Sequence, residues 1–241
     1  MQMGNWIDQS IRIMKIAIMQ PTYFPWIGYF SLIKFVDTFI FLDNVQFDSR
    51  SWQQRNQIAF GNKKIWITIP VKKKNLSKQS IAKVEIQDNK FKDKHLKSIY
   101  HSYSKTKYFK LIYPKIINML KNDKKSLSEI NKSIIIEISK LLEIKTKFLS
   151  AKNLKSKGKK SELLSNICSE IGANEYIAVL GSKEYMGDQI EFKKRNIKVN
   201  FFNFEQKKYA RGNYDFIPNL SILDLLFYNG PTAKKLLINE K

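Results

Sequence analysis

The sequence predicts an α/β fold: a mainly parallel sheet of βαβ units, with a β-hairpin and a helical insertion. Short strand-like runs alternate with helical patterns at both ends of the chain, and purely helical spacing fills the stretch between them. The 241 residues suffice for one large domain or two small ones, and a hydrophobic fraction of 43% is typical of a globular protein.

The first βαβ unit is predicted near the N-terminus. The run "KIAIMQ" at residues 15–20 is apolar and ends at a proline, and "DTFIFLD" at residues 37–43 is a second such run, so both read as buried strands. Residues 26–36 between them are long enough for about three helical turns. This order predicts parallel strands joined by a helical crossover.

The next segments change character twice. Residues 57–71 form two strand-like runs around a Gly-Asn pair, which predicts a hairpin, and residues 81–87 predict a further strand. Residues 91–143 show helical spacing of Leu and Ile, with breaks expected at Pro114 and at residues 121–125.

The last third returns to alternation. Strands are predicted at residues 146–154, 175–180 and 196–204, and helices at residues 161–171, 182–195 and between Pro218 and Gly230. The expected organisation is an N-terminal extension at residues 1–13, a first α/β half with the hairpin at 14–90, a helical segment at 91–145 and a second α/β half at 146–241.

Charge is the strongest compositional signal. The chain has 43 Lys and Arg against 21 Asp and Glu, a net charge of +22, which predicts attraction to nucleic acid, phosphorylated ligands or an anionic lipid surface. The surplus is nearly all lysine. The alternative to a specific anion-binding site is therefore that these are solvated lysines encoded by an AT-rich gene. The single cysteine, Cys168, predicts no disulfide, and no leader or apolar run of ~18 residues is evident, so we expect a cytoplasmic protein.

The turn "QPTYFPWIG" at residues 20–28 is the first candidate site. It follows a predicted parallel strand and opens a helix, the place where such sheets bind ligands and where free N–H groups favour phosphates. Its aromatic rings offer flat surfaces for a base or sugar; the alternative is a loop packed on its own aromatics. The substrate-binding candidates here are Gln20, Pro21, Tyr23, Trp26, Gly28 and Tyr29.

The segment "LDNVQFDSRSWQQRN" at residues 42–56 follows the next strand and should open on the same edge. Asp43 is a candidate acid or base, and the two arginines are candidate phosphate clamps, because lysine is the default cation in this chain. The binding candidates in this segment are Gln46, Arg50, Trp52, Arg55 and Asn56.

Other titratable groups are sparse. The two histidines, His95 and His101, are expected to be surface or packing residues, and neither a metal cluster nor a Ser/His/Asp relay is predicted. Tyr185 and Ser221 are further candidates. Asp224 lies within an apolar helix, so its charge should have a partner.

These motifs closely resemble the WbqC-like family over essentially the whole chain from Met14. The resemblance rests on "MKIAIMQPTYFPWIGYFSLI", "DTFIFLDNVQF", "SWQQRNQI", "WITIPV" and "FIPNLSILDLLFYNG". The family's second motif is matched at Asp37, Asp43, Gln46, Trp52, Arg55 and Asn56, whereas Asn44, Ser49 and Gln54 depart from it. A later motif keeps Tyr176, Lys183 and Tyr185.

The resemblance implies a role in bacterial surface polysaccharide, notably O-antigen, biosynthesis, acting on a nucleotide-activated and often amino sugar. A looser analogy links the opening layout to the nucleotidylyl transferase superfamily and hence to a Rossmann-like fold. Its two "HxGH" histidines are replaced here by Trp26 and Tyr29, so the fold could be shared while the histidine chemistry could not.

We therefore expect a transferase that attaches an acyl or aminoacyl group to the amine of a dTDP- or UDP-linked amino sugar, with coenzyme A or aminoacyl-tRNA as donor. Asp43 would take the proton, and Asp37 and Tyr185 are further catalytic candidates. Lys183, Ser221 and Asp224 complete the substrate-binding candidates. The alternatives are a tRNA- or carrier-binding module without catalysis and a sugar nucleotidyltransferase.

Overall fold

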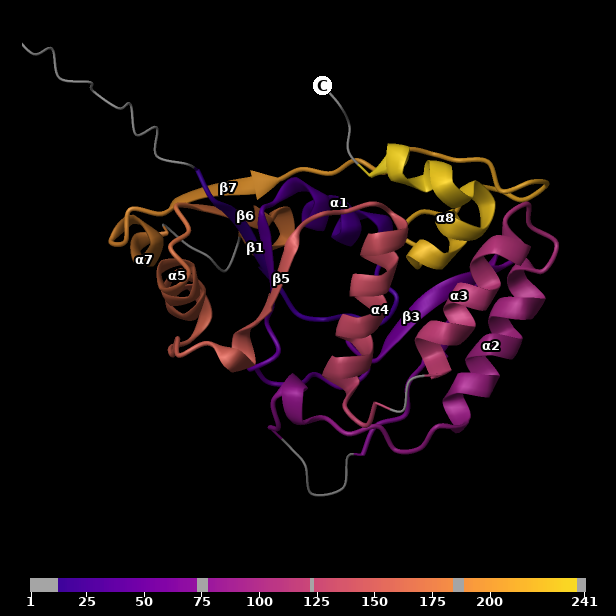
Figure 1. Ribbon diagram of the computed structural model, residues 1–241, viewed down its shortest axis with the longest axis horizontal. Helices are drawn as coiled ribbons and strands as arrows, with labels where there is room; N and C mark the ends of the chain where they lie inside the picture. Colours follow the sequence, from indigo (N-terminus) through magenta and orange to yellow (C-terminus); the bar gives the residue numbers. More distant parts are fainter. Residues whose placement is uncertain (1–12, 73–77, 122–123, 184–188, 238–241) are drawn as a thin grey trace, which may run out of the picture.

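The computed structural model describes residues 13–72, 78–121, 124–183 and 189–237, and it confirms the predicted α/β fold (Figure 1). A five-stranded sheet has the order β5-β2-β1-β6-β7, and every neighbouring pair is parallel. The strands are β1 (Lys15–Met19), β2 (Thr38–Phe41), β5 (Lys147–Ser150), β6 (Glu175–Val179) and β7 (Lys198–Phe202).

The strand order makes the sheet Rossmann-like. The chain runs outward from β1 through β2 to β5 and then returns to place β6 on the other side of β1. Ile16 therefore lies opposite Thr38 of β2 on one side and Tyr176 of β6 on the other. The point between β1 and β6 where the direction reverses is the topological switch point, at which open parallel sheets bind ligands.

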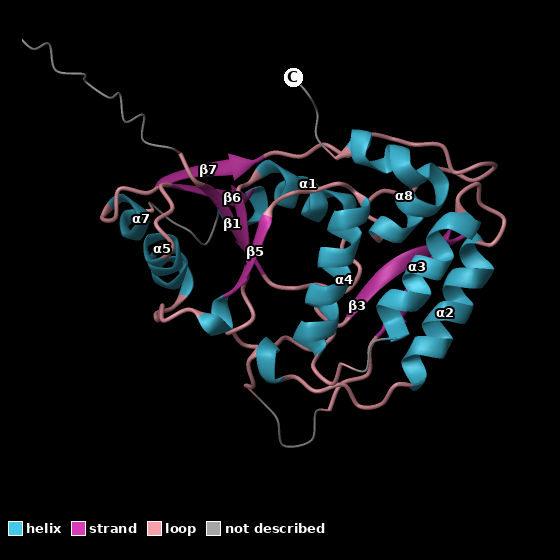
Figure 2. Cartoon of the chain, viewed as in Figure 1, coloured by secondary structure: helices cyan, strands magenta, loops and turns pink. Residues whose placement is uncertain are grey.

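Helices cover both faces of the sheet, as Figure 2 shows. Along β1, Ala17 packs in one core with helices α1 (Ile27–Phe35) and α4 (Leu127–Leu141). Ile16 and Ile18 pack in a second core with α5 (Lys160–Glu170) and α7 (Ile190–Lys193). Burial on both faces explains why the strands read as continuous apolar runs.

The hairpin lies away from the sheet, between helices. It consists of β3 (Arg55–Phe60) and β4 (Lys63–Thr68) and turns at Gly61, which has a φ of 59°. It packs against α2 (Lys90–Tyr103) and α8 (Ile222–Asn229). Helix α3 (Phe109–Lys121) packs against α2 and α4. The short helices are η1 (Ile81–Lys83), η2 (Ala151–Asn153), η3 (Leu180–Ser182) and η4 (Gly230–Leu236).

Two local predictions were wrong. Residues 81–87 form the turn η1 and an extended piece with isolated bridges rather than a strand, and their apolar side chains enter the core beside α4. The helical break lies before Phe109 and not at Pro114, which is inside α3. Pro114 and Lys110, whose carbonyl loses its usual N–H partner, are both exposed, so water can satisfy that carbonyl.

Asp224 on α8 has the charged partner that its burial requires. The Arg211 guanidinium donates from Nε to Asp224 Oδ2 at 3.0 Å, and the side chains are 1% and 0% exposed. Tyr209 donates to the same oxygen, while the other Arg211 nitrogens donate to the carbonyls of Asp215 and Gly61. This ion pair ties the hairpin turn to the C-terminal helix.

Replacing Arg211 by Met should lower the free energy of unfolding by about 3–5 kcal/mol, because it leaves the Asp224 carboxylate buried without its counter-charge. Urea unfolding followed by circular dichroism measures the change. Arg195→Met is the matched control, since Arg195 is a half-buried arginine whose pair with Glu191 lies near the surface. Equal, small losses in both variants would contradict the structural role of Arg211.

Candidate functional site

A pocket of about 490 Å³ opens at the carboxyl ends of β1 and β6, the switch point of the sheet. We call it the switch pocket. Its polar lining comes from Gln20, Thr22, Ser51, Gln53, Lys160 and Ser182. Its apolar lining comes from Ile18, Met19, Leu42, Val45, Trp52, Leu163, Leu164, Tyr176 and Val179. Amides, hydroxyls and an ammonium group thus face an apolar wall.

A second pocket of about 380 Å³ adjoins it, sharing Met19, Thr22 and Trp52. We call it the aromatic pocket; its other lining residues are Pro25, Trp26, Tyr29, Asn56 and Asn219. Trp26 is half-buried and packs its indole edge-on against Phe204, with ring centroids 5.7 Å apart. The two pockets form one groove along the loop that follows β1.

The backbone of this loop is held by side-chain amides from distant parts of the chain. Asn56 on β3 donates its Nδ2 hydrogens to the carbonyls of Tyr23, at 3.0 Å, and Phe24, at 2.8 Å. Asn131 on α4 donates to the carbonyls of Pro21, at 3.1 Å, and Gln53, at 2.7 Å. A loop with no regular structure thereby satisfies its buried carbonyls.

The tyrosines of the loop are also structural. Tyr29 donates its hydroxyl to the Gln20 carbonyl at 3.0 Å, and the Tyr23 hydroxyl lies 2.9 Å from His95 Nδ1. Both rings are buried, at 3% and 0% exposure, so Tyr23 is not available as a stacking surface. The surfaces that remain open to a ligand belong to Trp26 and to Trp52.

Gly28 makes room for Trp26. A Cβ added at Gly28 would lie 2.3 Å from carbon atoms of the Trp26 ring, far inside van der Waals contact. The indole therefore lies directly over the first turn of α1. The absence of a side chain at Gly28 thus makes room for the Trp26 indole and not for a ligand.

In the segment at residues 42–56, which follows β2, some of the candidate side chains are exposed and others are buried. Trp52 is 51% exposed and packs beside Trp66, with ring centroids 5.4 Å apart and planes tilted by 35°. The Arg55 guanidinium lies over the Trp66 ring, 4.2 Å from its centroid. Arg55 therefore supports the indole that flanks Trp52. Arg50 and Gln46 are exposed and line neither pocket.

Asp43 lies just after the carboxyl end of β2 and is fully buried. Its carboxylate accepts four hydrogen bonds from described residues. Lys132 Nζ, Ser150 Oγ and Ser128 Oγ donate to its Oδ2 at 2.7, 2.7 and 3.1 Å, and the Lys152 amide donates to Oδ1 at 3.0 Å. Burial raises the pKa of Asp43, but the bonds from Lys132 and Ser150 and the Lys132 charge outweigh it, so the pKa lies below its ordinary value. A carboxylate held in this way is a weak base.

Comparisons with known proteins identify the family of the chain. The sequence profile of the WbqC-like protein family matches residues 20–236. The chain belongs to the WbqC-like family. It is similar to the uncharacterized protein Rv1507c of Mycobacterium tuberculosis, with 32% identity over 221 residues that cover 91% of this chain and 95% of the relative. No solved structure matches it. No helix in the described ranges is both long enough and apolar enough to cross a membrane.

Several candidate residues of this WbqC-like chain do not line the groove. Asp37 precedes β2, so it lies at the amino edge of the sheet, where it accepts from the Lys15 amide at 2.8 Å. Ser221 caps α8 by accepting from the Leu223 amide. Lys183 is exposed after η3, with its ammonium 6.0 Å from the Phe201 ring. Tyr185 lies outside the described residues.

Other groove residues of the WbqC-like chain carry no distinctive sequence signal. Lys160 is one of many lysines, and Ser182 and Ser51 are serines to which the sequence pattern assigns no role. Gln53, which donates to Gln20 Oε1 at 2.8 Å, stands next to matched motif residues and could have been included on that ground. Asn131 could have been noticed because it is a polar residue on the apolar face of a predicted helix.

Replacing Gly28 by Ala should cost about 1–3 kcal/mol of unfolding free energy, because the new methyl group collides with the Trp26 indole. The cost should vanish in a Trp26→Ala background, where alanine is instead the better helix former. A double-mutant cycle by urea unfolding measures the coupling. An equal cost in both backgrounds would rule out the contact as its cause.

Stability should also fall in mild acid because of His95. Burial lowers the pKa of His95 to about 4, against a partial opposing effect of a hydrogen bond to the Thr68 backbone. The unfolded chain then binds the proton more readily, so this contribution is complete above pH 6.5 and is lost as the pH falls towards 4.

The loss should amount to about 3 kcal/mol for a pKa lowered from 6.5 to about 4. Urea unfolding between pH 7.5 and pH 4 measures it. His95→Gln should flatten this part of the pH dependence, and His101→Gln, which changes an exposed histidine, should leave it unchanged. The interpretation fails if the two variants follow the same pH curve.

Proposed function

We propose that this WbqC-like protein is a transferase of O-antigen or other surface polysaccharide biosynthesis, which binds a dTDP- or UDP-linked amino sugar and transfers an acyl or aminoacyl group to the sugar amine. The observation that carries the proposal is the groove formed by the switch and aromatic pockets. It lies where doubly wound sheets bind nucleotides. Trp26 lines the aromatic pocket, Trp52 lines both pockets, and Lys160, at the N-terminus of α5, lines the switch pocket.

The lining suits the parts of a nucleotide sugar. Lys160 is the first residue of α5, so its ammonium and the positive end of the helix favour a diphosphate at the same place. The indoles of Trp26 and Trp52 are suited to stacking a base. The side chains of Gln20, Gln53 and Thr22, which also line the switch pocket, offer two amides and a hydroxyl to the sugar hydroxyl groups.

The chemistry needs positioning more than a strong base. The neutral sugar amine attacks the carbonyl carbon of the donor, the C–N bond forms, and the C–S bond of a coenzyme A thioester or the C–O bond of an aminoacyl ester breaks. The proton of the attacking amine is transferred to the leaving group, which is the coenzyme A thiolate or the ribose alkoxide of the tRNA. No protein base is therefore required. This suits a groove in which no carboxylate is among the described lining residues.

Lys160→Ala and Trp52→Ala should each weaken binding of UDP- and dTDP-linked amino sugars by about 10-fold or more, because they remove a charge-assisted bond to phosphate and a stacking surface. Calorimetric titration measures the affinity. Lys198→Ala is the matched control, since Lys198 is an exposed lysine at the amino end of β7.

Mass spectrometry of the amino sugar after incubation with acyl-coenzyme A or aminoacyl-tRNA tests the transfer, which adds one acyl group to the amine. The proposal fails if no nucleotide sugar binds saturably, or if both variants bind as the wild type does. Binding without any transfer from either donor would retain the site and reject the transferase.

One observation favours a second function, a tRNA- or carrier-binding module. The exposed Trp52 and Trp66 indoles with the Arg55 guanidinium, on a chain of net charge +22, form the kind of stacking surface that single-stranded nucleic acid uses. Tight, salt-sensitive tRNA binding with no turnover of a nucleotide sugar would favour this function.

A further inference from the structure

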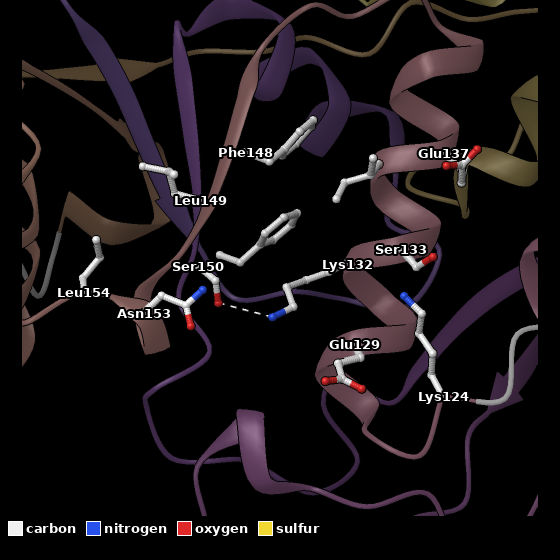
Figure 3. Close-up of a pocket in the computed structure, with 12 residues that line it drawn as sticks. Lys124, Glu129, Lys132, Ser133, Glu137, Phe148, Leu149, Ser150, Asn153 and Leu154 are labelled. Atoms are coloured by element: carbon white, nitrogen blue, oxygen red, sulfur yellow. Dashed lines mark hydrogen bonds between the residues drawn. The ribbon is translucent and has the colours of Figure 1, made fainter.

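A separate pocket of about 430 Å³ lies between α4 and the end of β5 (Figure 3). We call it the edge pocket. It is lined by Phe41, Lys124, Glu129, Lys132, Ser133, Ile136, Glu137, Phe148, Leu149, Ser150, Asn153 and Leu154. None of these residues lines the switch or aromatic pocket.

Both pockets lie at the carboxyl edge of the sheet, on either side of the chain that leaves β2. Phe41 packs in the core that contains α4, whereas Leu42, the next residue, packs in the other core and lines the switch pocket. Successive strand residues point to opposite faces, so the chain leaving β2 separates the pockets. The edge pocket is therefore not an extension of the proposed nucleotide-sugar site.

Lys132 is the central polar group of the edge pocket. Its side chain is 13% exposed, and its ammonium lies 2.7 Å from Asp43 Oδ2 and 3.2 Å from Ser150 Oγ. Figure 3 shows Lys132 extending from α4 across the pocket towards Ser150. An ammonium group has three hydrogens, and these two bonds use two of them. The third is available to a ligand in the pocket.

The charges around the pocket favour an anion. Asp43 neutralises Lys132, and the two glutamates of the lining are paired outside it, Glu129 with Lys152 at 3.9 Å and Glu137 with Lys140 at 2.8 Å. Lys124 has no carboxylate partner among the described residues. The lining thus carries one positive charge that no described protein group balances.

The rest of the lining is apolar. The Phe41 and Phe148 rings are stacked, with centroids 5.5 Å apart and planes 10° apart, and Ile136 packs in the same core. Leu149 and Leu154, which pack in the other core, are also in the lining. Ser133 and Asn153 add a hydroxyl and an amide near the lysines. A ligand that fits needs an anionic group at one end and a hydrophobic body at the other.

We propose that the edge pocket is a binding site for a small organic anion, a carboxylate or phosphate monoester with an apolar body. The anionic group accepts from Lys132 and Lys124, and the body packs on Phe41 and Phe148. The Asp43–Lys132 pair fixes the ammonium in place, so the site needs little rearrangement to bind.

Calorimetric titration of the full chain with phenylacetate and phenyl phosphate tests this, and the tighter of the two identifies the anionic group. Neutral phenylacetamide should bind at least 10-fold more weakly than phenylacetate. Lys132→Met should weaken binding at least 10-fold, whereas Lys97→Met, which changes an exposed lysine on α2, should leave it unchanged.

Lys132→Met leaves Asp43 without its counter-charge, so a second variant protects the test from unfolding. Ser133→Trp fills the pocket without touching the Asp43 bonds, and it should abolish binding while keeping the melting temperature. Ser169→Trp, at an exposed position of α5, is its control. The proposal is overturned if neither anion binds saturably, if phenylacetamide binds as tightly as phenylacetate, or if Ser133→Trp binds as the wild type does.

Discussion

The geometry of the candidate site depends on two buried amides, those of Asn56 and Asn131. Two prolines and a left-handed Phe24, with a φ of 41°, keep the loop after β1 out of regular structure. Its buried carbonyls therefore need donors from elsewhere, since an unpaired buried carbonyl costs about 1–3 kcal/mol. The hairpin supplies one amide and α4 the other. The hairpin and α4, which lie outside the sheet, thus fix the conformation of the loop that follows β1.

This arrangement explains the aromatic character of the loop. Tyr23 and Tyr29 bind the loop to the core through their hydroxyls, and the Trp26 indole covers Gly28. The loop is rich in aromatic side chains chiefly because it must be rigid without secondary structure. Only the indoles of Trp26 and Trp52 remain open to a ligand. Fewer residues are therefore available to bind a ligand than the motif contains.

Much of the fold could be predicted from the sequence, because parallel strands buried on both faces leave continuous apolar runs. The hydrogen-bond and ion-pair partners of individual side chains could not be predicted, because they depend on the order of the strands in the sheet. Lys132 is one of 38 lysines and lies 89 residues from Asp43, so no local pattern marks it as the counter-charge. Asp37 is different: it precedes its strand, and strand direction alone places it at the edge opposite Asp43.

The position of Asp43 limits what its substitution can reveal. Its carboxylate joins α4, the end of β5 and the Lys152 backbone, while the adjacent Leu42 lines the switch pocket. A change at Asp43 would disturb the Lys132 ammonium, the end of β2 and the wall of the groove together. Loss of activity on its removal is therefore expected whether or not the carboxylate touches a substrate. Informative variants leave this ion pair intact and alter one pocket at a time.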